Sequence, residues 1–156
     1  MQVDVRAWLG ELRHEVLELA KLEQKAEELE DRAGPRGMGM AVASGGGRVE
    51  LMTPVDHATQ IRQELEVRTA RLTLRLEFAT NVLYGRSGRG GLAKVRSYTD
   101  ADILTGYYLQ GLSWPKVAKE LSTDIESKWP AQWCRSRAMC SISAMERIGL
   151  EELADS

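Results

Sequence analysis

The sequence predicts an all-α protein: a long antiparallel, coiled-coil-like helical hairpin followed by a C-terminal helix-turn-helix domain. Apolar residues recur every seven positions through 3–33, and a second apolar stripe with helical spacing follows a Thr-Pro pair at residue 53. Ten of the 14 glycines fall within 34–47 and 85–91, where they interrupt the helical pattern. The expected parts are a hairpin over 1–84 with a flexible loop at 34–53, a Gly/Arg-rich linker at 85–97 and the helix-turn-helix domain at 98–150.

The first predicted helix carries a coiled-coil seam. A coiled-coil seam needs apolar residues at two positions of each seven-residue repeat, and apolar residues occupy most of these positions here. Glu, Lys and Arg lie between them. The positions seven apart hold Val5, Leu12, Leu19, Ala26 and Ala33, and the intervening positions hold Trp8, Leu22 and Leu29. One face of this helix must therefore be buried against a partner.

The second predicted helix starts at Thr53-Pro54, because Thr is a good N-cap and Pro fits the first helical position. Its apolar stripe consists of Ala58, Ile61, Leu65, Leu72, Leu76, Ala79 and Leu83. An antiparallel pairing of the two helices is the simplest way to bury both stripes. Because a two-helix hairpin has only one interface, we also expect a homodimer formed through the hairpin.

Three shorter helices are predicted after residue 97. Thr99 and Asp102 form a weak capping box for a helix over 100–110, which Gly111 ends. We expect Tyr108 on this helix and Trp114 at the start of the next to pack in the core of the domain. A role in base stacking is the alternative for these aromatics.

The second and third of these helices have clear start signals. Ser113 can cap the second helix, with Pro115 in its first turn, where a missing N–H costs little. Pro130 opens the third helix. The expected core face of the third helix contains Ala138, Ile142, Met145 and Ile148.

The stretch 102–121 resembles region four of bacterial sigma factors. It reads Asp-Ile-Leu-Thr-Gly-Tyr-Tyr-Leu-Gln-Gly-Leu-Ser-Trp-Pro-Lys-Val-Ala-Lys-Glu-Leu. Tyr107-Tyr108 stands where Arg-Tyr is usual, Ser113-Trp114 follows the turn, and Val117-Ala118 replaces Ile-Ala. With the long hairpin upstream, the chain is similar to small phage and prophage proteins of the sigma-like and late-transcription-regulator kind.

The resemblance covers residues 98–150 and departs from the family pattern before the third helix. The turn there is several residues longer, and the helix opens with Trp129-Pro-Ala-Gln-Trp133 in place of Ser-x-x-Thr-Val. The resemblance implies a DNA-binding transcriptional regulator or sigma-like factor of phage or prophage origin, with contact to the RNA polymerase core. The alternative is a phage assembly protein, such as a small terminase-like packaging subunit that recognises DNA.

The candidate DNA-binding residues follow from side-chain chemistry. Arg can donate to both acceptors of guanine, Gln can pair with adenine, and Lys or Ser can hold phosphates of double-stranded DNA. The first half of the third helix is the part that reaches base edges in this docking mode. The candidates are Gln132, Arg135, Ser136 and Arg137 on that helix, Lys128 before it, and Lys116 and Lys119 on the second helix.

Charge, cysteines and histidines narrow the function classes. The formal net charge is −2, yet residues 62–96 carry eight basic and three acidic side chains, so a local surface can bind phosphates. Cys134 and Cys140 lie six apart without a CxxC pair, and His14 and His57 each stand alone. We therefore expect no metal site, no cofactor and no catalytic centre.

The location is also an expectation from the sequence. No apolar run reaches the roughly 18 residues of a membrane helix. The N-terminus lacks the basic and then apolar pattern of a signal peptide. We therefore expect a cytoplasmic protein that does not bind membranes.

Overall fold

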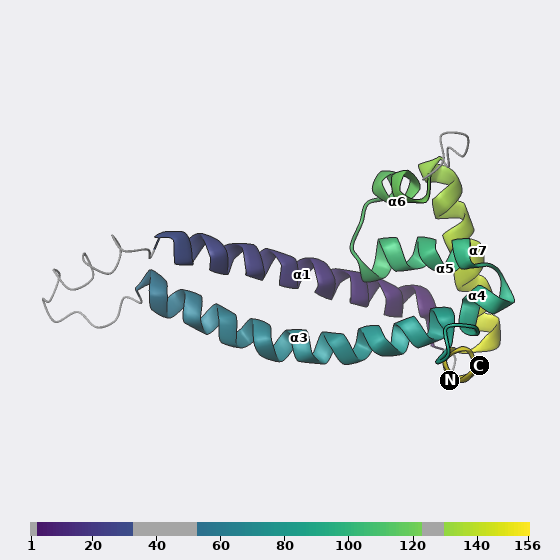
Figure 1. Cartoon of the computed structure of the whole chain (residues 1–156), viewed down its shortest axis with the longest axis horizontal. Helices are drawn as coiled ribbons and strands as arrows, with labels where there is room; N and C mark the ends of the chain where they lie inside the picture. The colour runs from purple at the N-terminus through teal and green to yellow at the C-terminus, as the bar shows by residue number, and fades with distance from the viewer. Residues whose placement is uncertain (1–2, 33–52, 123–129) are drawn as a thin grey trace, which may run out of the picture. The chain divides into compact units, whose positions relative to one another are not determined.

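The computed structural model describes residues 3–32, 53–122 and 130–156, and within these ranges every regular element is a helix. The all-α fold class is therefore confirmed. The helices are α1 (Val5–Arg32), α3 (Pro54–Tyr84), α4 (Gly91–Val95), α5 (Tyr98–Leu104), the π-helix η1 (Thr105–Leu109), α6 (Trp114–Leu121), α7 (Ala131–Ile148) and α8 (Leu150–Asp155) (Figure 1). None of the described helices is both long and apolar enough to cross a membrane. The expected loop at 34–53 lies outside the described residues, Thr53 excepted.

The chain forms two compact units, and each long helix contributes to both. The first unit contains Met1–Val16 and Leu72–Ser156, and the second contains Leu17–Arg71. The boundary expected near residue 84 does not separate these units. The reason is that the end of α3 is part of the first core, where Val82 and Leu83 are fully buried.

The predicted apolar stripes are the buried faces of α1 and α3. The buried residues are Val5, Leu12, Leu19 and Ala26 on α1, and Ala58, Ile61, Leu65, Leu72, Ala79 and Leu83 on α3. Leu9 and Val82, which the stripes did not include, are also fully buried. Trp8, Leu22 and Leu29 on α1 and Leu76 on α3, which were also predicted on these stripes, are only half-buried, and Ala33 lies outside the described residues. The helical spacing therefore identified the core side of each helix but not every residue on it.

Polar and aromatic contacts join the two long helices within each unit. In the first unit the rings of Trp8 and Phe78 meet edge to face at 6.0 Å. In the second unit Arg62 forms 2.7 Å ion pairs with Glu23 and with Glu30. These contacts are those that an antiparallel pairing requires, and the hairpin as a whole stays a prediction.

The predicted start of α3 is confirmed. The backbone N–H of Asp56 donates to Thr53 Oγ1 at 3.1 Å, and the Thr53 hydroxyl donates back to the Asp56 carboxylate at 2.8 Å. Pro54 is the first helical residue. This reciprocal pair satisfies one of the free N–H groups at the helix start.

The segment 85–97 is not the linker that its composition predicts. It contains helix α4, in which Leu92 and Ala93 are buried. Gly91 has φ +64°, and a Cβ atom there would lie 2.5 Å from the Val82 carbonyl oxygen. The backbone N–H of Gly91 donates to Ser156 Oγ at 2.6 Å. Glycine is therefore used here for left-handed backbone and close approach, both of which belong to a packed structure.

Helix α5 begins one residue after Ser97, earlier than predicted. Ser97 is the N-cap and accepts a 3.1 Å hydrogen bond from the Asp100 N–H, so the expected Thr99 capping box is wrong. The helix continues as the π-turn η1 over Thr105–Leu109. A π-turn changes the direction of the following side chains relative to a continuous α-helix, and such turns are frequent at functional sites.

The start signals of α6 and α7 are confirmed. Ser113 accepts from the Lys116 N–H, and Pro130 immediately precedes α7. Ala138, Ile142 and Met145 are buried on α7 as expected, whereas Ile148, at the end of the helix, is only half-buried. Gly149, with φ +99°, ends α7 and is followed by α8, a helix that the sequence reasoning did not include.

Replacing Ser141 with Ala is expected to leave the free energy of unfolding unchanged or to raise it by about 1 kcal/mol. Ser141 is fully buried on α7, and its hydroxyl has no hydrogen-bond partner among the described residues. Urea denaturation followed by circular dichroism measures the change. Ser143→Ala is the matched control, because its exposed hydroxyl donates to the Met139 carbonyl. A loss of more than about 1 kcal/mol in Ser141→Ala would show that this hydroxyl is satisfied in the folded protein.

Candidate nucleic-acid interface

Two helices of the first unit, α6 and α7, carry the candidate residues that the structure describes. Helix α7 contacts both α5 and α6, and α6 also contacts η1 (Figure 1). Val117 and Ala118 bury one side of α6, and Cys134 and Ala138 bury one side of α7. The other sides of α6 and α7 are exposed to solvent and carry the polar residues that the sequence singled out.

Gln132, Arg135 and Ser136 form one exposed surface, here called the α7 polar face. Their spacing of three and four residues places them on the same side of the helix, and all three are exposed. The first turn of α7 contains no acidic residue. The face therefore combines an amide, a guanidinium and a hydroxyl at the end of the helix where backbone N–H groups are free.

Two lysines are exposed on the neighbouring helix. Lys116 and Lys119 lie three residues apart, on the side of α6 away from Val117 and Ala118. In the described ranges neither lysine, nor Arg135, forms an ion pair. Lys128, which was also predicted to contact DNA, lies outside the described residues.

Arg137 lies away from the α7 polar face and is bound to a buried carboxylate. Its Nε donates to Asp100 Oδ1 at 2.8 Å, and its NH2 group donates to Oδ2 at 2.9 Å. Arg96 donates to the same carboxylate at 3.0 Å. Asp100 has no exposed surface, so its charge depends on these two guanidinium groups. The structure thus gives Arg137 a contact inside the protein, whereas the sequence assigned it to DNA.

An aromatic stack connects α1, η1 and α6. The Tyr107 ring lies parallel to the Trp114 ring at 3.8 Å, and the guanidinium of Arg13 lies 4.0 Å over the centre of the Tyr107 ring. Tyr108 is buried, as predicted, whereas Trp114, also predicted in the core, is partly exposed because it stacks on the partly exposed Tyr107 ring. The stack fixes the start of α6 against the end of η1.

A second polar cluster lies between α3 and α5. The Tyr84 hydroxyl donates to the Asp102 carboxylate at 2.5 Å and lies 3.1 Å from Thr105 Oγ1. Burial, and to a smaller extent the hydrogen bond to Asp102, raise the pKa of Tyr84. These residues line a pocket of about 320 Å³ that Glu120 also borders. Two carboxylates at its wall make this pocket a poor site for a phosphate.

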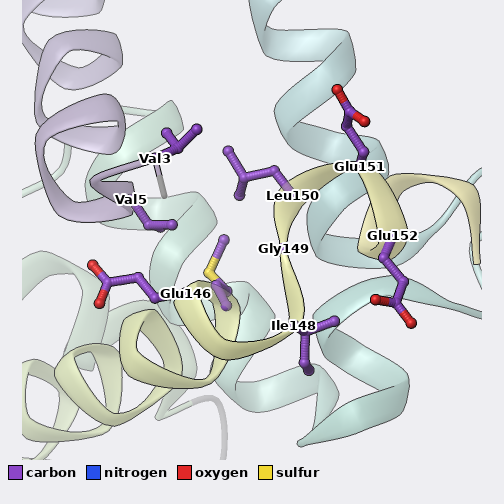
Figure 2. Close-up of a pocket in the computed structure, with 9 residues that line it drawn as sticks. Val3, Val5, Glu146, Ile148, Gly149, Leu150, Glu151 and Glu152 are labelled. Carbon is purple, nitrogen blue, oxygen red and sulfur yellow. The ribbon is translucent and has the colours of Figure 1, made fainter. Parts of the chain in front are cut away.

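A larger pocket of about 450 Å³ lies where α7 meets α8 (Figure 2). Val3, Val5 and Leu150 face one another across it. Its acidic residues are Glu146, Glu151 and Glu152. The carboxylates disfavour DNA here, so this pocket is not part of the candidate interface.

Neither cysteine belongs to a metal site or a disulfide in the described part of the chain. Cys134 is buried, Cys140 is exposed, and both thiols are free. Burial raises the pKa of Cys134, so its thiol is protonated near neutral pH. Among the described residues, no three His, Cys, Asp or Glu side chains are grouped so that they could hold a metal ion.

Comparison with protein-family models, with the sequences of curated proteins and with solved structures gives no match. The chemistry of the exposed residues on α6 and α7 is therefore the basis for assigning a function.

Proposed function

We propose that this protein binds double-stranded DNA through the α7 polar face, with the α6 lysines on flanking phosphates. The observation that carries the proposal is the α7 polar face itself. Gln132 and Arg135 are exposed one turn apart on a helix whose opposite side is in the core. These are the two side-chain types that pair with adenine and guanine edges in the major groove.

The supporting helices fit this role. Helix α6 begins at the Ser113 cap, precedes α7 in the chain and contacts it, which is the order expected of a helix-turn-helix. Its exposed lysines are available for phosphates. Arg137 is left out of the proposed interface because its guanidinium is bound to Asp100. The proposed contacts are therefore Gln132, Arg135 and Ser136 to bases and nearby phosphates, and Lys116 and Lys119 to the backbone.

We propose that the DNA-binding protein is a transcriptional regulator, with or without contact to the RNA polymerase core. The sequence resemblance of residues 102–121 to sigma region four supports it. A DNA-recognising packaging subunit is the alternative with the same exposed chemistry. The two differ in assembly: a regulator is expected as a dimer, and a packaging subunit as a ring whose mass by light scattering is far above that of a dimer.

Replacing Arg135 with Ala is expected to cost about 1 to 3 kcal/mol of binding to a preferred duplex, because a bidentate base contact is lost. Fluorescence anisotropy with duplex DNA at several salt concentrations measures it. Arg147→Ala is the matched control. Arg147 is an exposed arginine in the last turn of the same helix, three turns away from the α7 polar face.

The two variants together test the assignment. The preference of the protein for its selected duplex should fall in Arg135→Ala and persist in Arg147→Ala. Equal losses of affinity in both variants would show that binding depends only on the net charge of the protein and not on the position of the arginine. No loss in either would remove α7 from the interface. Circular dichroism of both variants checks that the helices remain.

A further inference from the structure

The pocket where α7 meets α8 has an apolar centre. Val5 and Met145 line it and are fully buried, and Leu150 beside them is half-buried. Val3 faces Leu150 across the opening and is 54% exposed (Figure 2). The volume of about 450 Å³ lies within the range of about 300 to 1,000 Å³ that is typical of ligand pockets. Exposed apolar surface in a concave place of this size is surface that a ligand can cover.

The pocket exists because the chain turns at Gly149. Helix α7 ends at Ile148, and the φ of +99° at Gly149 changes the chain direction before α8 begins at Leu150. A Cβ at Gly149 would meet no atom within 4 Å, so there is open space beside this residue. The third wall is the start of α1, and all three walls belong to the first unit.

Three glutamates line the same pocket. Glu146 is on α7, and Glu151 and Glu152 are on α8. All three are exposed, and none forms an ion pair with another described residue. The described lining contains no Lys, Arg or His, since Arg6 and Arg147, the nearest arginines in the sequence, are not part of it. The pocket therefore combines an apolar centre with negative charges that lack a partner in the described structure.

The positions of the charges restrict the kind of ligand. Figure 2 shows the three carboxylates on different sides of the pocket, apart from one another. No three acidic, His or Cys side chains of the described ranges are grouped so that they could hold a metal ion. Negative charge disfavours nucleic acid and an anionic lipid surface. A suitable ligand has an apolar group for the centre and separate positive charges for the edge, which is the chemistry of a basic amphipathic peptide.

We propose that this pocket binds a basic amphipathic peptide segment of a partner protein. An apolar side chain of the peptide enters between Val3 and Leu150, and its Lys or Arg side chains pair with the glutamates. The inference goes beyond the proposed function and does not rest on it. Glu146 is eleven residues after Arg135 on the same helix, or about 16 Å along its axis. The partner and the DNA are therefore bound at opposite ends of α7.

Anisotropy of a labelled peptide of Leu and Lys in amphipathic helical register tests the role of the charges. Wild type should bind this peptide, and binding should weaken as salt rises. A triple variant should bind about tenfold more weakly at low salt and should lose most of the salt dependence. Its substitutions are Glu146→Gln, Glu151→Gln and Glu152→Gln. The matched control removes the same charge from exposed sites on α1 and α3 and should bind as wild type does; it carries Glu27→Gln, Glu66→Gln and Glu77→Gln.

Val3→Ser tests the apolar centre without changing a residue inside a helix. It should weaken binding by about threefold at every salt concentration, because this contribution is not electrostatic. Val67→Ser is the matched control, since Val67 is 53% exposed on α3 and does not line the pocket. It should leave the affinity unchanged. Circular dichroism should show the same helical content in all variants.

Four outcomes would overturn the inference: no binding of the peptide by wild type, equal losses in the two triple variants, no loss in Val3→Ser, or equally tight binding of a peptide with Ser in place of every Leu. A wild-type dimer that dissociates in Val3→Ser, seen by light scattering, would instead identify a second copy as the occupant and also overturn it. Arg135→Ala should bind the peptide as wild type does. Failure of DNA recognition therefore leaves this inference standing, and failure of peptide binding leaves the proposed function standing.

Discussion

Replacing Arg137 with Met is expected to lower the free energy of unfolding by about 3 kcal/mol. Met keeps most of the side-chain volume and removes the two charge-assisted hydrogen bonds to Asp100. The fully buried carboxylate would then keep only the contact with Arg96. Urea denaturation followed by the helical circular dichroism signal measures the loss.

Two further variants identify the cause of that loss. Arg135→Met changes the same residue type two positions away on an exposed site and should cost less than about 0.5 kcal/mol. In the double variant Arg137→Met with Asp100→Leu, much of the stability should return, because no uncompensated charge remains in the core. If Arg137→Met is as stable as Arg135→Met, the buried ion pair contributes nothing and Arg137 is free for another role.

Replacing Gly91 with Ala is expected to lower the free energy of unfolding by about 3 kcal/mol. The left-handed backbone at φ +64° contributes roughly 1 to 2 kcal/mol of this cost. The remainder comes from the added Cβ, which would lie 2.5 Å from the Val82 carbonyl oxygen and 2.7 Å from the Gly85 nitrogen. Because these neighbours are backbone atoms, the clash cannot be relieved by a rotamer change.

Gly88→Ala is the matched control for Gly91→Ala. Gly88 has φ +76°, but a Cβ there would meet no atom within 4 Å. Its substitution should therefore cost only the backbone part, roughly 1 to 2 kcal/mol. Equal losses in the two variants would mean that the close approach at Gly91 relaxes. A loss near zero in Gly91→Ala would mean that 85–97 is the linker that its composition predicted.

Helical periodicity and start signals were readable from the sequence because both are local. The spacing of Leu12 and Leu19 shows which face of one helix is buried without reference to its partner. The Ser113 cap depends only on the few residues that follow it. The glycines at 85–91 show the limit of this approach. So many glycines in a short segment predict a flexible linker. The positive φ angles and the close approach of Gly85 and Gly90 to Ser156 depend instead on packing against the C-terminus, which is far away in the sequence.

The candidate site was predicted in part for the same reason. The spacing of Gln132, Arg135 and Ser136 places them together on any helix, and all three are exposed. Arg137 is two residues after Arg135, so a helix places it on a different side. This spacing could have excluded Arg137 from the α7 polar face. Its partner Asp100 lies 37 residues away, among the buried residues of α5, so the ion pair needs the tertiary fold.

The role of Arg13 on α1 was missed because its partner lies far along the chain. The contact of Arg13 with Tyr107 spans 94 residues. The seven-residue spacing of Arg6 and Arg13 was visible in the sequence, but cations on one face of a long helix usually remain solvated. Only its contact with Tyr107 distinguishes Arg13 from the other arginine.

Selection of bound duplexes from a random DNA pool tests the central claim most directly. If α7 reads base edges, wild type should enrich a limited set of sequences, and Arg135→Ala should lose that enrichment while Arg147→Ala keeps it. Enrichment should weaken as salt rises, because phosphate contacts contribute to the affinity. Retention of no duplex, or retention of all sequences equally by wild type and both variants, would contradict DNA recognition by this helix.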